Sequence, residues 1–228
     1  FLVKATAGAA IASIPAKSVW ATGLTNSIVA SGHGSDFANG VQIVLLSPNS
    51  WKSNGTDLTD TYKSVFHQNP LIGSELRDLI PASALEHITL GAILGKSQYV
   101  NSFITAAGGI IVNPYHFPDG EYKGVKFVVN HQDVYIKYRS LKTALKTPYS
   151  GASDLNKLIV STYLNAKYSG VTSGVVYPVV KSPAYPNAPY NSIDEFARKL
   201  QASVGHSNTR TLLTDLHNNP NSLATLRY

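Results

Sequence analysis

The residues best suited to catalysis lie together in the segment Gly32-His33-Gly34-Ser35-Asp36, which places a histidine, a serine and an aspartate in one short run. A nucleophilic serine needs a histidine as base and a carboxylate that orients the histidine, so the residue types fit hydrolysis. Catalytic residues of this kind normally converge from separate parts of a fold, whereas these are chain neighbours. We therefore interpret the segment as a glycine-rich loop and keep the enzymatic interpretation as an alternative.

Other signatures of catalysis or cofactor binding are incomplete. The stretch from Gly91 to Ser97 resembles a phosphate-binding loop, but it has three residues between its glycines where four are needed, and it follows a helical pattern. The sequence has no Gly-x-Ser-x-Gly elbow of the kind that carries a hydrolase serine. The seven histidines never stand three or four residues apart, so a metal site would need distant ligands. We predict no enzymatic activity, no cofactor and no metal.

The elements that would position any site predict an α+β fold. We expect a single compact body with a helix-rich C-terminal half, one β-hairpin and an N-terminal apolar extension. Residues 1–21 form the apolar segment, residues 22–40 are a linker rich in serine, glycine and asparagine, and residues 41–228 are the globular domain. With 228 residues, the chain is long enough to bury a sizeable core.

Strand signals occur in two places. Residues 41–46 are an apolar run between Gly40 and Pro48, which predicts a buried strand. Residues 125–129 and 134–138 alternate around a polar stretch, which predicts a hairpin with a four-residue turn at 130–133. Between the first strand and the first helix, we expect residues 47–61 to be a loop.

Helix signals are stronger. Ser83 and Glu86 form a capping box that opens a helix ending at Gly95, and Ser192 and Glu195 form a second one. We further expect helices at 97–107 and from Asn208 to 217. Another helix should run from a cap at Ser153 to about residue 168, with its apolar residues along one stripe. Four prolines between 171 and 190 predict an extended segment on the surface.

The charge of the chain is uneven. The formal net charge is +6, and the region from Lys123 to Lys181 holds nine lysines and arginines against two aspartates. Ten of the thirteen tyrosines lie between Tyr115 and Tyr190. Such a region could bind nucleic acid or an acidic polysaccharide by charge pairing and stacking, or it could be a solvated basic face with half-buried tyrosines. The candidate contacts for an anionic polymer are Lys123, Lys126, Lys137, Arg139, Lys142 and Lys146.

The N-terminal segment has the parts of an export signal. An uncharged apolar run at 5–14 ends at Pro15, and Val19-Trp20-Ala21 would suit cleavage after Ala21. The run is too short to span a bilayer, which takes about 20 apolar residues. Cysteine and methionine are both absent. We therefore expect either an export signal that is removed or, if Phe1 is a true mature terminus, a retained apolar segment that must be buried in a protein contact.

Three resemblances point to the bacterial cell surface. Phe1, Leu2 and Lys4 match the end of the twin-arginine export motif, although its arginines would precede Phe1. Leu164-Asn165-Ala166 with Tyr177-Pro178 resembles a segment of exported bacterial surface proteins of unassigned activity. Type IV pilins also begin with a phenylalanine and an apolar helix that is buried between filament subunits. This run is shorter, and Ala5 stands where pilins have a glutamate, so the pilin resemblance implies only an assembly anchor.

These observations lead to a structural function. We expect an exported subunit at the cell surface, or outside the cell, that forms a pilus-like homopolymer and has copies of itself as partners. The expected interface residues are Phe1, Leu2, Val3, Gly8, Ile11, Ala12 and Ile14. Low charge content and abundant tyrosine suit protein–protein contacts. The alternative is a monomeric extracytoplasmic module that binds an anionic polymer such as extracellular DNA or acidic polysaccharide.

Overall fold

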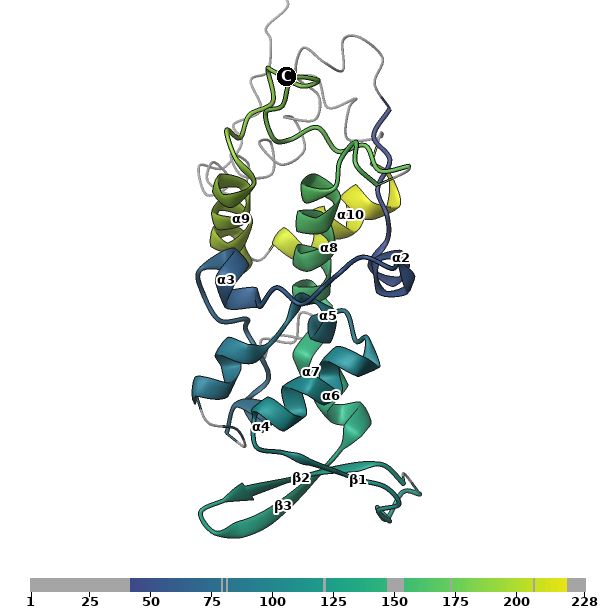
Figure 1. The fold of residues 1–228 in the computed structure, drawn as a ribbon, viewed down its shortest axis with the longest axis vertical. Coiled ribbons are helices and arrows are strands. Elements are labelled where there is room, and N and C mark those ends of the chain that lie inside the picture. The colour runs from purple at the N-terminus through teal and green to yellow at the C-terminus, as the bar shows by residue number, and fades with distance from the viewer. Residues whose placement is uncertain are drawn as a thin grey trace, which may run out of the picture.

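The structure is a computed structural model that describes residues 42–220, except 79, 81, 121, 147–153, 173 and 207. The predicted N-terminal segment, the linker, the His33 loop and Ser153 therefore lie outside the described residues. The described chain has the predicted α+β fold, with helices and a three-stranded antiparallel sheet. Figure 1 shows a body that is longer than it is wide, with the sheet at one end and α8, α9 and α10 toward the other.

Helix α8 (Leu155–Lys167) is the centre of the helical part. The helices α2, α5, α7, α9 and α10 all pack against it. Every side chain from Ile159 to Ala166 is buried, so the expected single apolar stripe is wrong. The helix tolerates burial on all sides because its polar side chains bond inside the fold. The Asn165 side chain, for example, donates to Leu46 O at 2.9 Å and accepts from Leu46 N at 2.8 Å.

The sheet has the strand order β1-β2-β3, in which β1 is Ile110–Val112, β2 is Gly124–Val129 and β3 is Gln132–Lys137. Val125 and Phe127 of β2 are buried against the helical body, while Lys126 and Val128 point to the other side. The hairpin is therefore confirmed, and β1 is a strand that the sequence did not predict.

The hairpin turn is shorter than predicted. Val129 pairs with Gln132, so only Asn130 and His131 form the turn, and both have positive φ angles, 50° and 65°. Two central residues with positive φ make the tight turn that matches the natural twist of a hairpin. Asparagine tolerates this conformation better than most residues, which explains why Asn130 can begin the turn.

The predicted helix from Ser83 to Gly95 is two separate elements. A 3-10 helix, η4, covers Ala82–His87, and α5 covers Leu90–Ile93. The break arises because Thr89 pairs with Thr61 as an isolated bridge, and the Thr89 hydroxyl caps α5 by accepting from Ala92 N at 3.2 Å. Glu86 pairs with Lys63 instead, so the predicted capping box is wrong. Gly95 ends α5 with a φ of 79°, as predicted.

Two predicted extended segments differ from the expectation. Residues 41–46 do not form a regular strand: Val44 makes a single bridge to Val176, and only Ile43 of the described part is fully buried. The proline-rich stretch 171–190 is extended but not superficial, because Val175, Tyr177 and Val179 are core residues. Tyr177 packs edge-on against Phe196 of α9 with ring centroids 6.1 Å apart. Each segment therefore contributes side chains to the core without pairing as a regular β-strand.

The remaining helices complete the body. Helices α6 (Ser97–Ala106), α9 (Ile193–Ala202) and α10 (Thr209–Asn218) agree with the sequence. Ser192 caps α9 by accepting from Glu195 N at 3.1 Å, while Glu195 accepts from Asn191 N at 2.9 Å. The structure adds helices that the sequence analysis assigned to loops or left unassigned: α2 (Pro48–Ser53), α3 (Tyr62–Phe66), α4 (Ser74–Arg77), η5 (Ser203–Gly205) and α7 (Tyr138–Lys146).

Candidate interaction surface

The side of the sheet that faces away from the helices is the most distinctive surface of the described chain. We call it the outer sheet face, and it consists of residues whose side chains alternate with the buried ones. Cross-strand pairing sets Ile110 and Tyr135 on either side of Lys126. The members of the face are Ile110, Val112, Lys126, Val128, Asp133, Tyr135 and Lys137.

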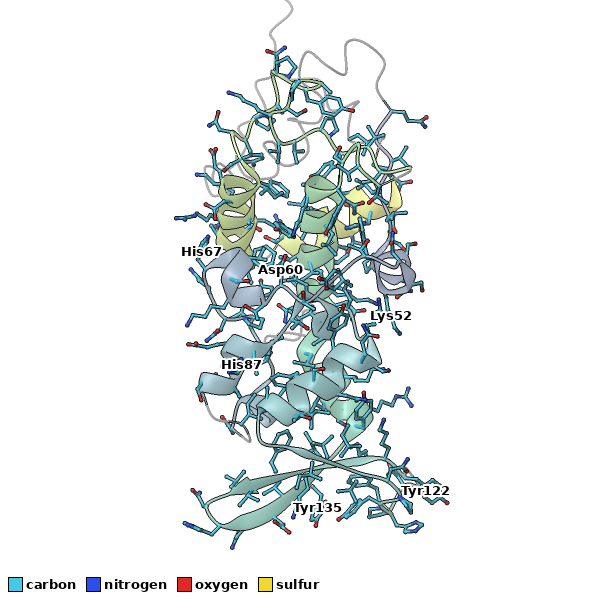
Figure 2. The ribbon with its side chains drawn as sticks, in the orientation of Figure 1. Lys52, Asp60, His67, His87, Tyr122 and Tyr135 are labelled. Atoms are coloured by element: carbon cyan, nitrogen blue, oxygen red, sulfur yellow. The ribbon has the colours of Figure 1, made fainter. Side chains whose placement is uncertain are left out.

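Three of the five most exposed large apolar side chains of the described chain lie on or beside the sheet, and the other two, Val44 and Val171, lie elsewhere. Ile110 is 56% exposed and Val128 is 62% exposed, and Tyr122, in the connection between β1 and β2, is 57% exposed. Figure 2 shows Tyr122 and Tyr135 at the sheet end of the molecule, remote from His67 and Asp60. Single exposed apolar residues are ordinary on protein surfaces, but a contiguous apolar patch marks a site of contact with a partner. Ile110 and Val128 lie on neighbouring strands and can form such a patch, whereas Tyr122 lies beyond the opposite end of β2.

Aromatic rings cover part of the outer sheet face. Tyr115 stacks on Tyr135, with ring centroids 4.4 Å apart and planes 11° from parallel, and Phe117 packs edge-on against Tyr115 at 4.7 Å. A Cβ at Gly124 would lie 3.2 Å from the Phe117 ring, so glycine lets the ring approach the strand. The connection between β1 and β2 is therefore folded back onto its own sheet, and its tyrosines are part of the surface.

The lysines of the face are balanced by aspartates. Lys126 lies 3.2 Å from Asp133, and Lys137 forms an ion pair with Asp119. Lys123 and Lys142 lie elsewhere, with their ammonium groups 3.9 Å and 5.8 Å from the centre of the Tyr138 ring. Arg139 is exposed in α7, and Lys146 is the last residue of that helix. The six predicted basic contacts are thus divided between two places.

A cavity of about 230 Å³ lies beside β3, which is one of the two edge strands of the sheet. Its walls include Tyr135, Ile136 and Lys137 of β3, Leu141 of α7 and Leu76 of α4. Side chains from both faces of β3 line it, so the cavity lies along the edge of the strand and not over one face. The wall is mostly apolar, and this suits an aliphatic side chain of a partner.

Two histidines form contacts that deserve comparison with catalytic sites. His67 Nε2 lies 2.5 Å from Asp194 Oδ1 on the surface, and Arg198 also contacts this carboxylate at 2.9 Å. The hydrogen bond from His67 and the charge of Arg198 hold the pKa of Asp194 below its usual value. His217 Nε2 lies 3.0 Å from Ser161 Oγ, but Ser161 is completely buried, so a substrate has no access to this pair. In the described ranges, no three side chains of the metal-binding types form a group.

No protein family, no curated protein and no solved structure matches this chain. Among the helices that the structure describes, none has the length and apolar character needed to cross a membrane. The functional interpretation therefore rests on the geometry of the outer sheet face and of the cavity beside β3.

Proposed function

We propose that the protein is a structural subunit that assembles with copies of itself into a filament on or outside the cell, anchored through its N-terminal segment. The observation that supports this most is the outer sheet face. It combines exposed Ile110 and Val128 with a stack of tyrosines, on the side of the sheet that faces away from the helices. Interfaces between proteins are enriched in tyrosine, which this face shares, and its charged side chains Lys126 and Lys137 are neutralised by aspartates of the same chain.

The apolar run at 5–14 supplies the second contact in this proposal. Its small residues, such as Gly8 and Ala12, permit close approach to a neighbouring subunit. A contact between two different surfaces of the same protein repeats without closing, so it generates a helical fibre. The export-signal features of the same segment are consistent with a place outside the cytoplasm.

Binding of an anionic polymer has weaker support. Lys126 and Lys137, the two predicted basic contacts on the outer sheet face, are each paired with an aspartate of the same chain. A polymer phosphate would have to displace these carboxylates, so its gain from each lysine is reduced. Retention on immobilised DNA that falls steeply with salt, and that decreases in Lys126→Ala, would favour this second function.

Deletion of residues 1–14 tests the filament. We expect the truncated protein to keep the far-ultraviolet circular dichroism of the full chain and to form no filaments in negative-stain electron microscopy. A matched control removes fourteen residues from the linker, 24–37, and leaves the apolar run intact; this variant should still polymerise. Filaments formed by the 1–14 deletion would contradict the proposal.

A further inference from the structure

The free edge of β3 presents an ordered row of backbone groups. Tyr138 N donates to Lys123 O at 3.0 Å, which identifies 123 and 138 as a hydrogen-bonded pair of the antiparallel ladder. Pairing alternates along such a ladder, so Val134 and Ile136 also direct their backbone groups at β2. Asp133, Tyr135 and Lys137 consequently direct their N–H and C=O groups away from β2. Helix α7 begins at Tyr138, so the C=O of Lys137 belongs to the first turn of that helix, and among the described residues no strand pairs with this edge of β3.

We propose that this edge pairs antiparallel with β3 of a second copy, so that Tyr135 lies opposite Tyr135 of the partner subunit. The two three-stranded sheets would then continue as one sheet across a two-fold axis. This proposal goes beyond the proposed function and does not depend on it, because it uses neither the N-terminal segment nor a filament.

The backbone alone selects this register. Only outward backbone groups can exchange hydrogen bonds with a second edge, and β3 has outward N–H groups at 133, 135 and 137 and outward C=O groups at 133 and 135. If Tyr135 faces its own copy, all three residues on each chain find a partner of the same kind. A shift of two residues in either direction leaves one outward residue of each strand without such a partner. The centred register therefore forms the most hydrogen bonds.

Charge selects the same register. With Tyr135 on the axis, Asp133 lies opposite Lys137 of the partner subunit, and Lys137 lies opposite the partner's Asp133. Opposite charges directly across an antiparallel pair are stabilising, and like charges are destabilising. Asp133 already contacts Lys126 and Lys137 already pairs with Asp119, so each cross-subunit contact would join an existing ion pair and extend it to a row of alternating sign. Charged side chains usually protect an edge from pairing, but here they favour pairing in one arrangement.

Apolar contact supports the pairing from the other face. Val134 and Ile136 point toward the helices and are only partly buried. In the proposed register, Val134 of each copy lies opposite Ile136 of the other. This position adjoins the cavity of about 230 Å³ whose wall includes Ile136, Leu141 and Leu76. The partner's Val134 can therefore enter an apolar space that the single chain leaves open.

Complementary charge variants of the full chain test the pairing. Asp133→Lys places lysine at both positions, and Lys137→Glu places acid at both, so each variant alone brings like charges together. We expect each to self-associate at least about tenfold more weakly than the parent in analytical ultracentrifugation. An equimolar mixture should recover association, because each chain then meets the opposite charges. The recovery also shows that both variants are folded.

Lys126→Glu is the matched control, because it changes a charge on the same face but on the central strand. It should affect self-association less than Lys137→Glu does. Equal effects of all three single variants, or a mixture that stays as weakly associated as its components, would overturn the proposal.

A crosslink provides a second readout that works inside larger assemblies. The chain has no cysteine, so Tyr135→Cys introduces a single thiol. Opposite residues of a hydrogen-bonded antiparallel pair have Cα atoms about 5.5 Å apart, which is within the range of a disulfide. We expect covalent dimers on mild oxidation, and far fewer from Ile110→Cys on the same face. Equal yields from the two variants would contradict a two-fold axis at Tyr135.

Discussion

At the scale of single residues, His217 shows how burial fixes a protonation state. The hydroxyls of Ser161 and Thr162 each lie within hydrogen-bond reach of Leu158 O, at 3.0 Å and 2.8 Å. Each hydroxyl has one hydrogen, so His217 Nε2, 3.0 Å and 3.1 Å from the two oxygens, must be the donor to them. His217 Nδ1 is buried with no partner in the described chain. Loss of solvation therefore lowers the pKa of His217 to about 4.

This pKa predicts acid sensitivity. The unfolded chain takes up a proton near the ordinary histidine pKa of 6.5, while the folded ring stays neutral until about pH 4. The unfolded state thus binds more protons between these values, and the free energy of unfolding should fall by roughly 3 kcal/mol as the pH drops from 6.5 to 4. His217→Gln should remove this part of the slope in urea titrations, whereas His87→Gln, at an exposed position, should keep it. An unchanged slope in His217→Gln would show that other groups cause the acid sensitivity.

Asn165 carries a second prediction at this scale. Its amide bonds both backbone groups of Leu46 and also donates to Ser161 O at 2.8 Å, so it ties the segment before α2 to the central helix. Asn165→Ala leaves the groups of Leu46 without these partners, and we expect a loss of about 2 kcal/mol in the free energy of unfolding. Asn49→Ala, which removes an exposed contact to Lys157, should cost less than about 0.5 kcal/mol. Similar midpoints of urea unfolding for both variants would refute this role.

At the scale of elements, the packing of α5 on α6 depends on a glycine. A Cβ at Gly91 would lie 2.2 Å from Cδ2 of Tyr99, whose hydroxyl accepts from Leu58 N at 3.2 Å. Glycine to alanine in a helix normally stabilises by about 1 kcal/mol, but here the ring would have to move, and overpacking costs about 1–3 kcal/mol. We expect Gly91→Ala to be destabilising in thermal unfolding. Gly55→Ala, with no atom near the new Cβ, should be nearly neutral.

The hairpin turn predicts a change in the other direction. His131 has a φ of 65°, in the left-handed region that is costly for a side chain with a Cβ. His131→Gly creates Asn-Gly, the preferred pair for this turn, and should stabilise by about 1 kcal/mol. An increase in the midpoint of thermal unfolding would confirm it. Val128→Gly, within β2, should lower the midpoint, so a general effect of glycine can be separated from the effect of the turn.

The elements also show what the sequence could predict. Helices α6, α9 and α10 were correct because their apolar spacing and their glycine, serine or asparagine ends are local signals. The capping box predicted at Ser83 was wrong because Thr89 forms a bridge to Thr61, which is distant in the sequence, and this bridge interrupts the predicted helix. The stretches 41–46 and 171–190 were misjudged for the same reason: their burial is decided by α8 and α9, not by their own pattern.

The candidate surface was only partly predictable. A turn of four residues would have put Lys126 opposite Lys137, whereas the actual turn puts Lys126 opposite Tyr135. The predicted register of β2 against β3 differed from the actual one by two residues. The strand faces were therefore predicted correctly, while the cross-strand partners were not. The stacking of Tyr115 on Tyr135 could not be foreseen, because it requires β1 and a connection that folds back over the sheet. Composition did indicate the tyrosine-rich region itself.

At the scale of the whole molecule, the first described residues and the sheet lie far apart. The described chain begins near the end of the body that is remote from the sheet, as Figure 1 shows, and Val44 bridges to Val176 there. The outer sheet face and the β3 edge form the other end. A subunit with this arrangement can make one contact through its N-terminal segment and a different one through its sheet. The first contact would extend a filament, and the second, being two-fold, would join subunits in pairs.

The two contacts should therefore be separable in the assembled protein. Deletion of residues 1–14 removes the extending contact and should leave dimers, since the β3 edge remains intact. Lys137→Glu removes the pairing and should leave filaments with about half the mass per length of the parent, because a two-fold contact joins subunits two at a time. The combined variant should be monomeric. Mass per length from scanning transmission electron microscopy and molar mass from light scattering measure these outcomes. Monomers from the deletion alone would mean that β3 does not pair, and filaments of unchanged mass from Lys137→Glu would mean the same.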